Sequence, residues 1–159
     1  MLDIDALIGA LRASDLPVEP VAPFGGWSSI LQIGLVDGLA GALMIRESGP
    51  EALEAVFTCS VTADVGERRA EVEELMATVD RAALPARLFL FRDEMGFAIH
   101  GGCRVADLEA LALEYVLNGR RICAYVLAPL AALIDGETSR AETIAAFGFL
   151  ASDRNQGEI

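Results

Sequence analysis

The residues of this chain that could take part in acid–base, nucleophilic or metal chemistry are few and widely spaced. His100 is the only histidine among the 159 residues, so a site that needs two histidines is excluded. Cys103 follows His100 by three positions, and an odd spacing on one β-strand directs two side chains to opposite faces. A catalytic Cys–His pair is therefore not expected here. We interpret His100 as a surface or interface residue, and an enzyme that uses His100 or Cys103 is the least favoured hypothesis.

The three cysteines indicate a structural role. Cys59, Cys103 and Cys123 lie far apart within apolar patterns, as small core residues of a protein in a reducing compartment do. We therefore predict a cytoplasmic location, no disulfide framework and no cysteine-bound metal.

The acidic and basic residues exclude further kinds of site. Glu67, Glu71 and Glu74 share one ridge of a predicted helix, but carboxylate-bridged metals on helices normally need a Glu-x-x-His partner, which this chain lacks. A solvent-exposed acidic face is the preferred interpretation. All twelve basic residues are arginines, so phosphate-loop, Schiff-base and general-base lysines are excluded. We predict no cofactor, no metal and no catalysis.

Charge and hydropathy point to protein partners. A formal net charge of −12 would repel nucleic acid and anionic membranes. The 53% content of hydrophobic residues is high, yet no uncharged apolar run reaches the roughly 18 residues of a membrane-spanning helix. The longest runs, 21–36 and 122–134, contain proline or glycine, and Asp3 and Asp5 argue against a signal peptide. The apolar excess therefore predicts contact with another polypeptide.

The periodicity predicts an α+β fold. We expect an antiparallel sheet of about five strands with helices packed on one face, in the order α-β-β-β-α-β-β-α. The expected helices are 4–14, 67–83 and a long one that starts after Asp107, continues through Gly119 and kinks or ends at Pro129. The expected strands are 28–36, 40–46, 56–65, 87–93 and 97–105, with hairpin turns at Asp37-Gly38 and around 93–96.

The domain boundaries follow from these elements. Residues 1–135 are predicted to form a single domain, and 136–151 an appended short helix. That helix begins with a capping-box pattern between Ser139 and Glu142. The tail 152–159 is predicted to be disordered.

This order of elements resembles the type III secretion chaperone-like fold of the CesT-type chaperones and the YbjN family of sensory transduction regulators. The segment 87–97, RLFLFRDEMGF, followed by a strand and a long helix, looks most like the YbjN pattern, and the entry through Asp15-Leu16-Pro17-Val18 resembles both families. The resemblance covers about residues 2–135. It implies a cytoplasmic homodimer that binds other polypeptides without a cofactor. The proline- and glycine-rich segment 20–27 and the extra tail helix depart from the pattern.

The candidate binding residues are apolar. Trp27 follows Gly25-Gly26, lies close to Phe24, and precedes a strand in which only Gln32 is polar between Ile30 and Val36. One interpretation is a covered core strand with Trp27 as its cap. The other is a groove or dimer surface built from Phe24, Trp27, Ile30 and Leu31, since aromatic residues dominate such contacts, or an open strand edge that accepts a peptide. The predicted function is a homodimer that holds a client polypeptide, and the alternative is a small-ligand-binding regulatory domain.

Overall fold

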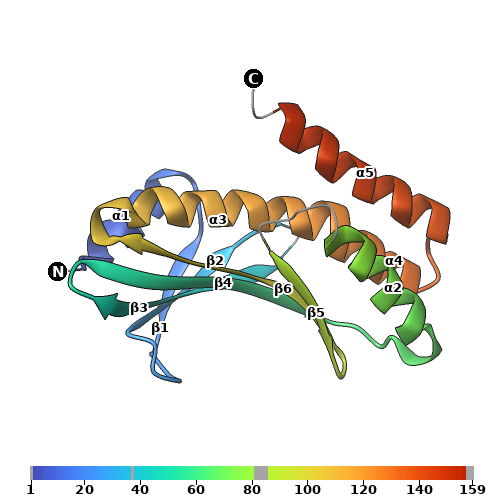
Figure 1. Ribbon diagram of the computed structural model, residues 1–159, viewed down its shortest axis with the longest axis horizontal. Coiled ribbons are helices and arrows are strands. Elements are labelled where there is room, and N and C mark those ends of the chain that lie inside the picture. The colour runs from blue at the N-terminus through green and yellow to red at the C-terminus, as the bar shows by residue number, and fades with distance from the viewer. Residues whose placement is uncertain (1, 37, 81–85, 157–159) are drawn as a thin grey trace. The chain divides into compact units, whose positions relative to one another are not determined.

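The computed structural model describes residues 2–36, 38–80 and 86–156 of an α+β protein (Figure 1). Its strands form an antiparallel sheet in the order β1-β2-β3-β4-β6-β5. The strands are β1 (Val18–Val21), β2 (Ser29–Gly34), β3 (Ala40–Gly49), β4 (Ala52–Thr62), β5 (Arg87–Phe91) and β6 (Glu94–Arg104). The helices are α1 (Ile4–Ala13), α2 (Arg69–Asp80), α3 (Leu108–Ile122), α4 (Ala128–Ile134) and α5 (Arg140–Gln156), with short 3₁₀ segments at Gly66–Arg68 and Val105–Asp107.

The predicted α+β class is confirmed, but the sheet has six strands rather than about five. The additional strand is β1, a segment for which the prolines predicted only extended chain. Val18–Val21 pairs antiparallel with Ile30–Ile33. Pro20 has no backbone N–H, and such a residue is tolerated because β1 lies at the edge of the sheet.

Two turns differ from the prediction. The β3–β4 connection is tight, with Gly49 paired to Ala52 and Glu51 at a positive φ of 58°, so both strands reach the turn. The second hairpin turns at Arg92 and Asp93, with Arg92 at a φ of 54°, so Met95 and Gly96 belong to β6 instead of the turn. A two-residue turn with positive φ matches the twist of the flanking strands. Of the other predicted boundaries, Asp37 in the first hairpin turn and the helix end at 81–85 lie outside the described residues.

The long helix continues beyond Pro129, where a kink or an end was predicted. α3 passes through Gly119, as predicted, and a π-helical segment, Cys123–Leu127, joins it to α4. Pro129 cannot donate to the turn before it and its ring crowds that turn, and a local widening of the helix accommodates both effects. The proline therefore does not end the helix.

By length and composition alone, the continuous helix Val105–Ile134 could cross a membrane, and 39% of its most apolar window is buried within the protein. A core helix of a soluble protein has the same properties. This is weak support for a membrane location, and the predicted cytoplasmic location stays a prediction.

The chain divides into two compact units. Unit 1 comprises Met1–Cys59 and Ala98–Gly119, and unit 2 comprises Ser60–Phe97 and Arg120–Ile159. The single domain predicted for 1–135 stays a prediction. α5 extends to Gln156, beyond the range 136–151 expected for the appended helix, and residues 157–159 lie outside the described part.

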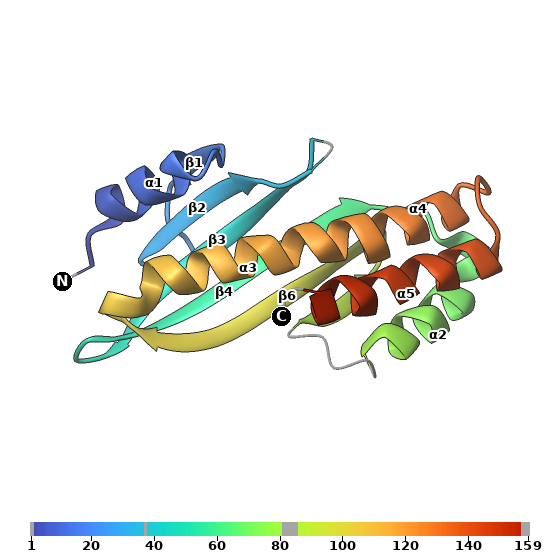
Figure 2. The same cartoon turned by 90° about the horizontal axis from the view of Figure 1, so that it is seen from above.

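In unit 1, α1 and α3 lie on the same face of the strands (Figures 1 and 2). Leu31, Leu43 and Phe57 are register partners on β2, β3 and β4 and are all buried. Gly41 leaves room for the Phe57 ring, since a Cβ at Gly41 would lie 2.4 Å from the ring. The covered face of this sheet is therefore closely packed.

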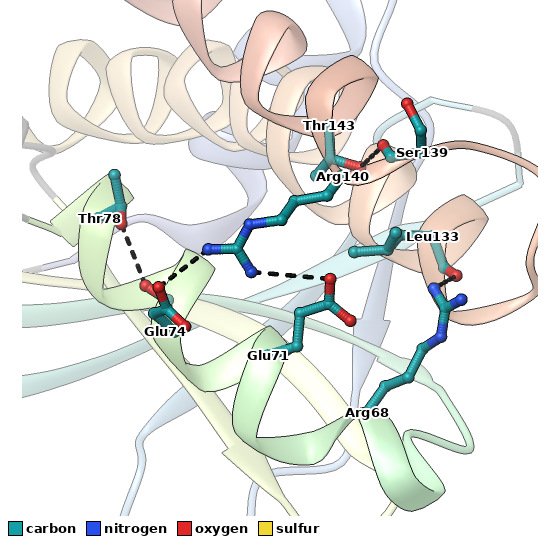
Figure 3. A network of polar contacts seen from close by, with 8 residues as sticks. All are labelled: Arg68, Glu71, Glu74, Thr78, Leu133, Ser139, Arg140 and Thr143. Carbon is teal, nitrogen blue, oxygen red and sulfur yellow. Dashed lines mark hydrogen bonds and ion pairs between the residues drawn. The ribbon is translucent and has the colours of Figure 1, made fainter.

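In unit 2, α5 contacts α4 and the π-helical segment (Figure 2). The predicted capping box is confirmed, because the Ser139 N–H donates to Glu142 and the Glu142 N–H donates to the Ser139 hydroxyl. Arg140 then forms ion pairs with Glu71 at 3.6 Å and Glu74 at 2.9 Å (Figure 3). Two of the three glutamates predicted to form a solvent-exposed acidic face therefore bind α5 to α2.

Candidate protein-binding face

The sheet of unit 1 has a second face, opposite the one on which α1 and α3 lie, and we call it the open face. Its strand positions alternate with the buried row of Leu31, Leu43 and Phe57. They are Glu19, Val21, Ile30, Gln32, Ala40, Ala42, Met44, Arg46, Ala52, Glu54, Val56, Thr58, Ala98, His100, Gly102 and Arg104, and the loop residue Trp27 adjoins them through Arg46. Most of these side chains are small or apolar. An antiparallel sheet often has one face without helices, but that face is then usually more polar.

A polar row crosses this face. The Arg46 guanidinium lies over the Trp27 ring, 4.7 Å from its centroid. The Arg46 Nε donates to Glu54 Oε2 at 2.6 Å, and Glu54 Oε1 lies 2.8 Å from His100 Nε2. The row therefore joins the segment before β2 to β3, β4 and β6, and both carboxylate oxygens of Glu54 have partners.

The contacts within this row shift the pKa values of Glu54 and Arg46. The hydrogen bond from Arg46, followed by that from His100, lowers the pKa of Glu54 below its ordinary value. The same hydrogen bond with Glu54 raises the pKa of Arg46. The Glu54 carboxylate is thus held ionised, and its negative charge is balanced within the row by the positive charge of Arg46.

The row predicts a pH dependence of stability. Because the folded-state pKa of Glu54 is lowered, its contribution is present above the unfolded-state pKa of about 4.3 and is lost as the pH falls through the folded-state value. We expect Glu54→Gln to melt below the wild type at pH 7, and the gap to narrow as the pH falls below the unfolded-state pKa of about 4.3. Thermal melts of both proteins across this range measure it. Glu19→Gln, at another exposed carboxylate of the open face, is the control. A gap that does not narrow as the wild type is acidified to the point of unfolding would contradict the role given to the ionised carboxylate.

The arrangement does not form a nucleophilic site. His100 and Cys103 lie on opposite faces of β6, as their spacing predicts, because Gly101 and Cys103 are directed toward Tyr115 of α3. Burial, followed by the charge of Asp107, raises the pKa of the Cys103 thiol, which keeps the thiol protonated. Cys59 and Cys123 are buried. Across residues 2–36, 38–80 and 86–156, no group of three His, Cys, Asp or Glu side chains could hold a metal.

The four predicted binding residues are distributed over both faces. Phe24 is 65% exposed and its carbonyl accepts the Trp27 N–H at 3.2 Å. Trp27 is half-buried beneath Arg46. Ile30 belongs to the open face but is buried, whereas Leu31 belongs to the covered face and is 1% exposed. The structure thus joins Phe24 to Trp27 through a backbone hydrogen bond and separates Leu31 from Trp27.

Sequence reasoning missed the polar row. The pairing of Arg46 with Glu54 is a cross-strand contact over the tight turn at Gly49, and a shorter predicted loop would have revealed it. His100 has no local signal of this kind. It joins Glu54 only because β6 lies beside β4 in the sheet.

Arginines from helices bind the backbone of both edge strands. In unit 1, the Arg12 guanidinium donates to the Val18 carbonyl of β1 at 2.8 Å. In unit 2, Arg69 donates to the Leu90 carbonyl of β5 at 3.3 Å. The Val18 and Leu90 carbonyls are hydrogen-bond acceptors on the strand edges, and a strand added at either edge would need such acceptors. The face of the unit 1 sheet is therefore a better candidate for binding than a strand edge.

Comparison with known proteins finds no family model and no curated protein that matches this chain. The resemblance to the YbjN and CesT-type families stays a prediction.

Proposed function

We propose that this chain is a non-enzymatic protein-binding domain that acts as a homodimer and holds a client polypeptide. The observation that carries the proposal is the open face of unit 1, a sheet surface opposite α1 and α3 on which most side chains are small or apolar. The loop that carries Trp27 also holds Phe24, which is 65% exposed. Exposed apolar surface that does not close a core is characteristic of interaction sites.

Two further observations support this function. The polar row is neutralised within the face, so a partner can cover it without supplying a matching charge. The half-buried Trp27, held under Arg46, presents an aromatic surface of fixed orientation at the side of the face. Rigid aromatic groups lose little conformational entropy on binding and often contribute strongly to contact energy.

A matched pair of variants tests the proposal. Phe24 and Phe91 are almost equally exposed, at 65% and 63%, but Phe24 lies in the same loop as Trp27 in unit 1 and Phe91 ends β5 in unit 2. We expect Phe24→Ser to weaken polypeptide binding at least tenfold, because loss of an aromatic side chain that anchors an interface costs about 2 kcal/mol or more. Phe91→Ser should bind like the wild type.

The binding measurement uses two readouts. The first is suppression of aggregation of a chemically denatured model protein, titrated with each variant. The second is quantitative cross-linking in native host extract. Equal activity of the two variants in both assays would contradict the proposal. A small molecule retained through purification and detected by native mass spectrometry would instead favour the ligand-binding alternative.

A further inference from the structure

We propose that a second copy of this chain occupies the open face, so that two unit 1 sheets pack face to face. This rests on the proposed function and specifies which polypeptide covers the surface when no client is bound.

The charge of the face supports a second copy. Among its described strand positions, the carboxylates are Glu19 and Glu54 and the guanidiniums are Arg46 and Arg104, so the formal charges cancel while His100 is neutral. The whole chain carries −12. Two copies would repel each other across an average part of this surface, but not across a neutral face. A basic client would gain no attraction here and would be drawn to the acidic remainder of the molecule.

The local bonding supports the same partner. Glu54 is engaged on both oxygens by Arg46 and His100, and Arg104 lies 3.4 Å from Asp107. The partner therefore needs a surface that is largely apolar, small-featured and free of net charge. The open face is itself such a surface, and a two-fold interface brings identical patches together. At its centre, Gln32, Ala42 and Thr58 are register partners, which leaves the small Ala42 side chain between them.

The small size of the open face indicates a weak association between the two copies. Five strands spaced about 4.8 Å apart, contributing on average about six residues of about 3.4 Å each, give a flat footprint of about 490 Å². A standard interface buries roughly 800 Å² on each partner. We therefore expect a dissociation constant in the micromolar range, with the dimer populated at high protein concentration and open to displacement by a client.

Sedimentation velocity of the full chain, from about 1 µM to about 500 µM, tests this inference. The wild type should change from a 16.8 kDa monomer to a dimer across the range. Ala42→Glu should weaken the dimer at least tenfold, because two like charges would then be buried near the two-fold axis. Ala145→Glu is the matched control. Ala145 is exposed on α5 in unit 2, and this variant should associate like the wild type.

A second variant separates charge effects from loss of folding. Ala42→Arg should also be monomeric, and an equal mixture with Ala42→Glu should regain association, because opposite charges then meet between the two copies. Far-ultraviolet circular dichroism confirms that each variant is folded. A wild type that stays monomeric, a dimer that survives both Ala42 variants, or a mixture that fails to associate would overturn the inference.

The two proposals fail differently. A monomeric wild type in which Phe24→Ser still reduces polypeptide binding leaves the client binding of the proposed function standing and removes the homodimer. A dimer that Ala42→Glu disrupts supports the second copy on the open face. If Phe24→Ser and Phe91→Ser then bind polypeptide equally well, the client binding is removed and the dimer stands.

Discussion

Replacing Gly41 by alanine should destabilise the protein by about 3 kcal/mol, at the upper end of what overpacking of a core costs. The added Cβ would lie 2.4 Å from Cζ and 2.7 Å from Cε2 of Phe57. Phe57 is fully buried against the covered face, so its ring cannot move away without displacing neighbours. At roughly 2–4 °C for each kcal/mol in a chain of this size, we expect the melting temperature to fall by about 6–12 °C.

A second substitution makes this prediction specific. Phe57→Leu shortens the side chain that Gly41 accommodates, so Gly41→Ala should cost less in the Phe57→Leu background than in the wild type. A double-mutant cycle from chemical unfolding should give a favourable coupling of about 1–2 kcal/mol. Gly9→Ala is the control, because Gly9 lies within α1 and a Cβ added there would meet no atom within 4 Å outside the neighbouring helix backbone. It should stabilise the protein by up to about 1 kcal/mol. Similar effects at Gly9 and Gly41 would refute the packing argument.

The second large effect is expected at Arg140, and it should be local. Arg140→Glu removes the two ion pairs that bind the start of α5 to Glu71 and Glu74 of α2 and replaces them with repulsion (Figure 3). Exposed ion pairs contribute about 0.2–1 kcal/mol each. Their loss plus the repulsion should make amide hydrogen exchange in α5 roughly tenfold faster, because local opening governs exchange there.

Hydrogen exchange detected by mass spectrometry measures this change. The melting temperature should fall only slightly, because Thr143 and Leu150 of α5 remain buried. Combining Arg140→Glu with Glu74→Arg should restore much of the protection. Arg104→Glu reverses the charge of an exposed ion pair with Asp107 in unit 1 and should leave exchange in α5 unchanged. Faster exchange spread over the whole chain would show that Arg140 acts on global stability instead.

Several features could be predicted because their signals are local. The alternation in β4 placed Phe57 and Cys59 on the buried side, and the same period placed His100 and Cys103 on opposite faces of β6. The capping box at Ser139 formed as its spacing indicates. Each signal depends on residues within a few positions of one another, where the strand or helix period fixes the relative direction of the side chains.

Other features were hidden because apolar residues do not reveal which side they face. The almost wholly apolar β2 puts Ile30 on the open face and Leu31 on the covered face, and both are buried. A run of this kind gives no alternation from which to choose the exposed residues. Phe24 and Trp27 were recognised as candidates, but the surface to which they belong was not.

The amino-acid sequence by itself determined the α+β class, the identity of most elements, and the absence of histidine-pair and lysine chemistry. Only the tertiary structure decided that Glu54 and His100, 46 positions apart, share a hydrogen bond, and that Glu71 and Glu74 meet Arg140. These contacts depend on which strands and helices become neighbours, and that choice is made by burial of apolar surface over the whole chain. Periodicity describes one element at a time and therefore carries no information about such neighbours.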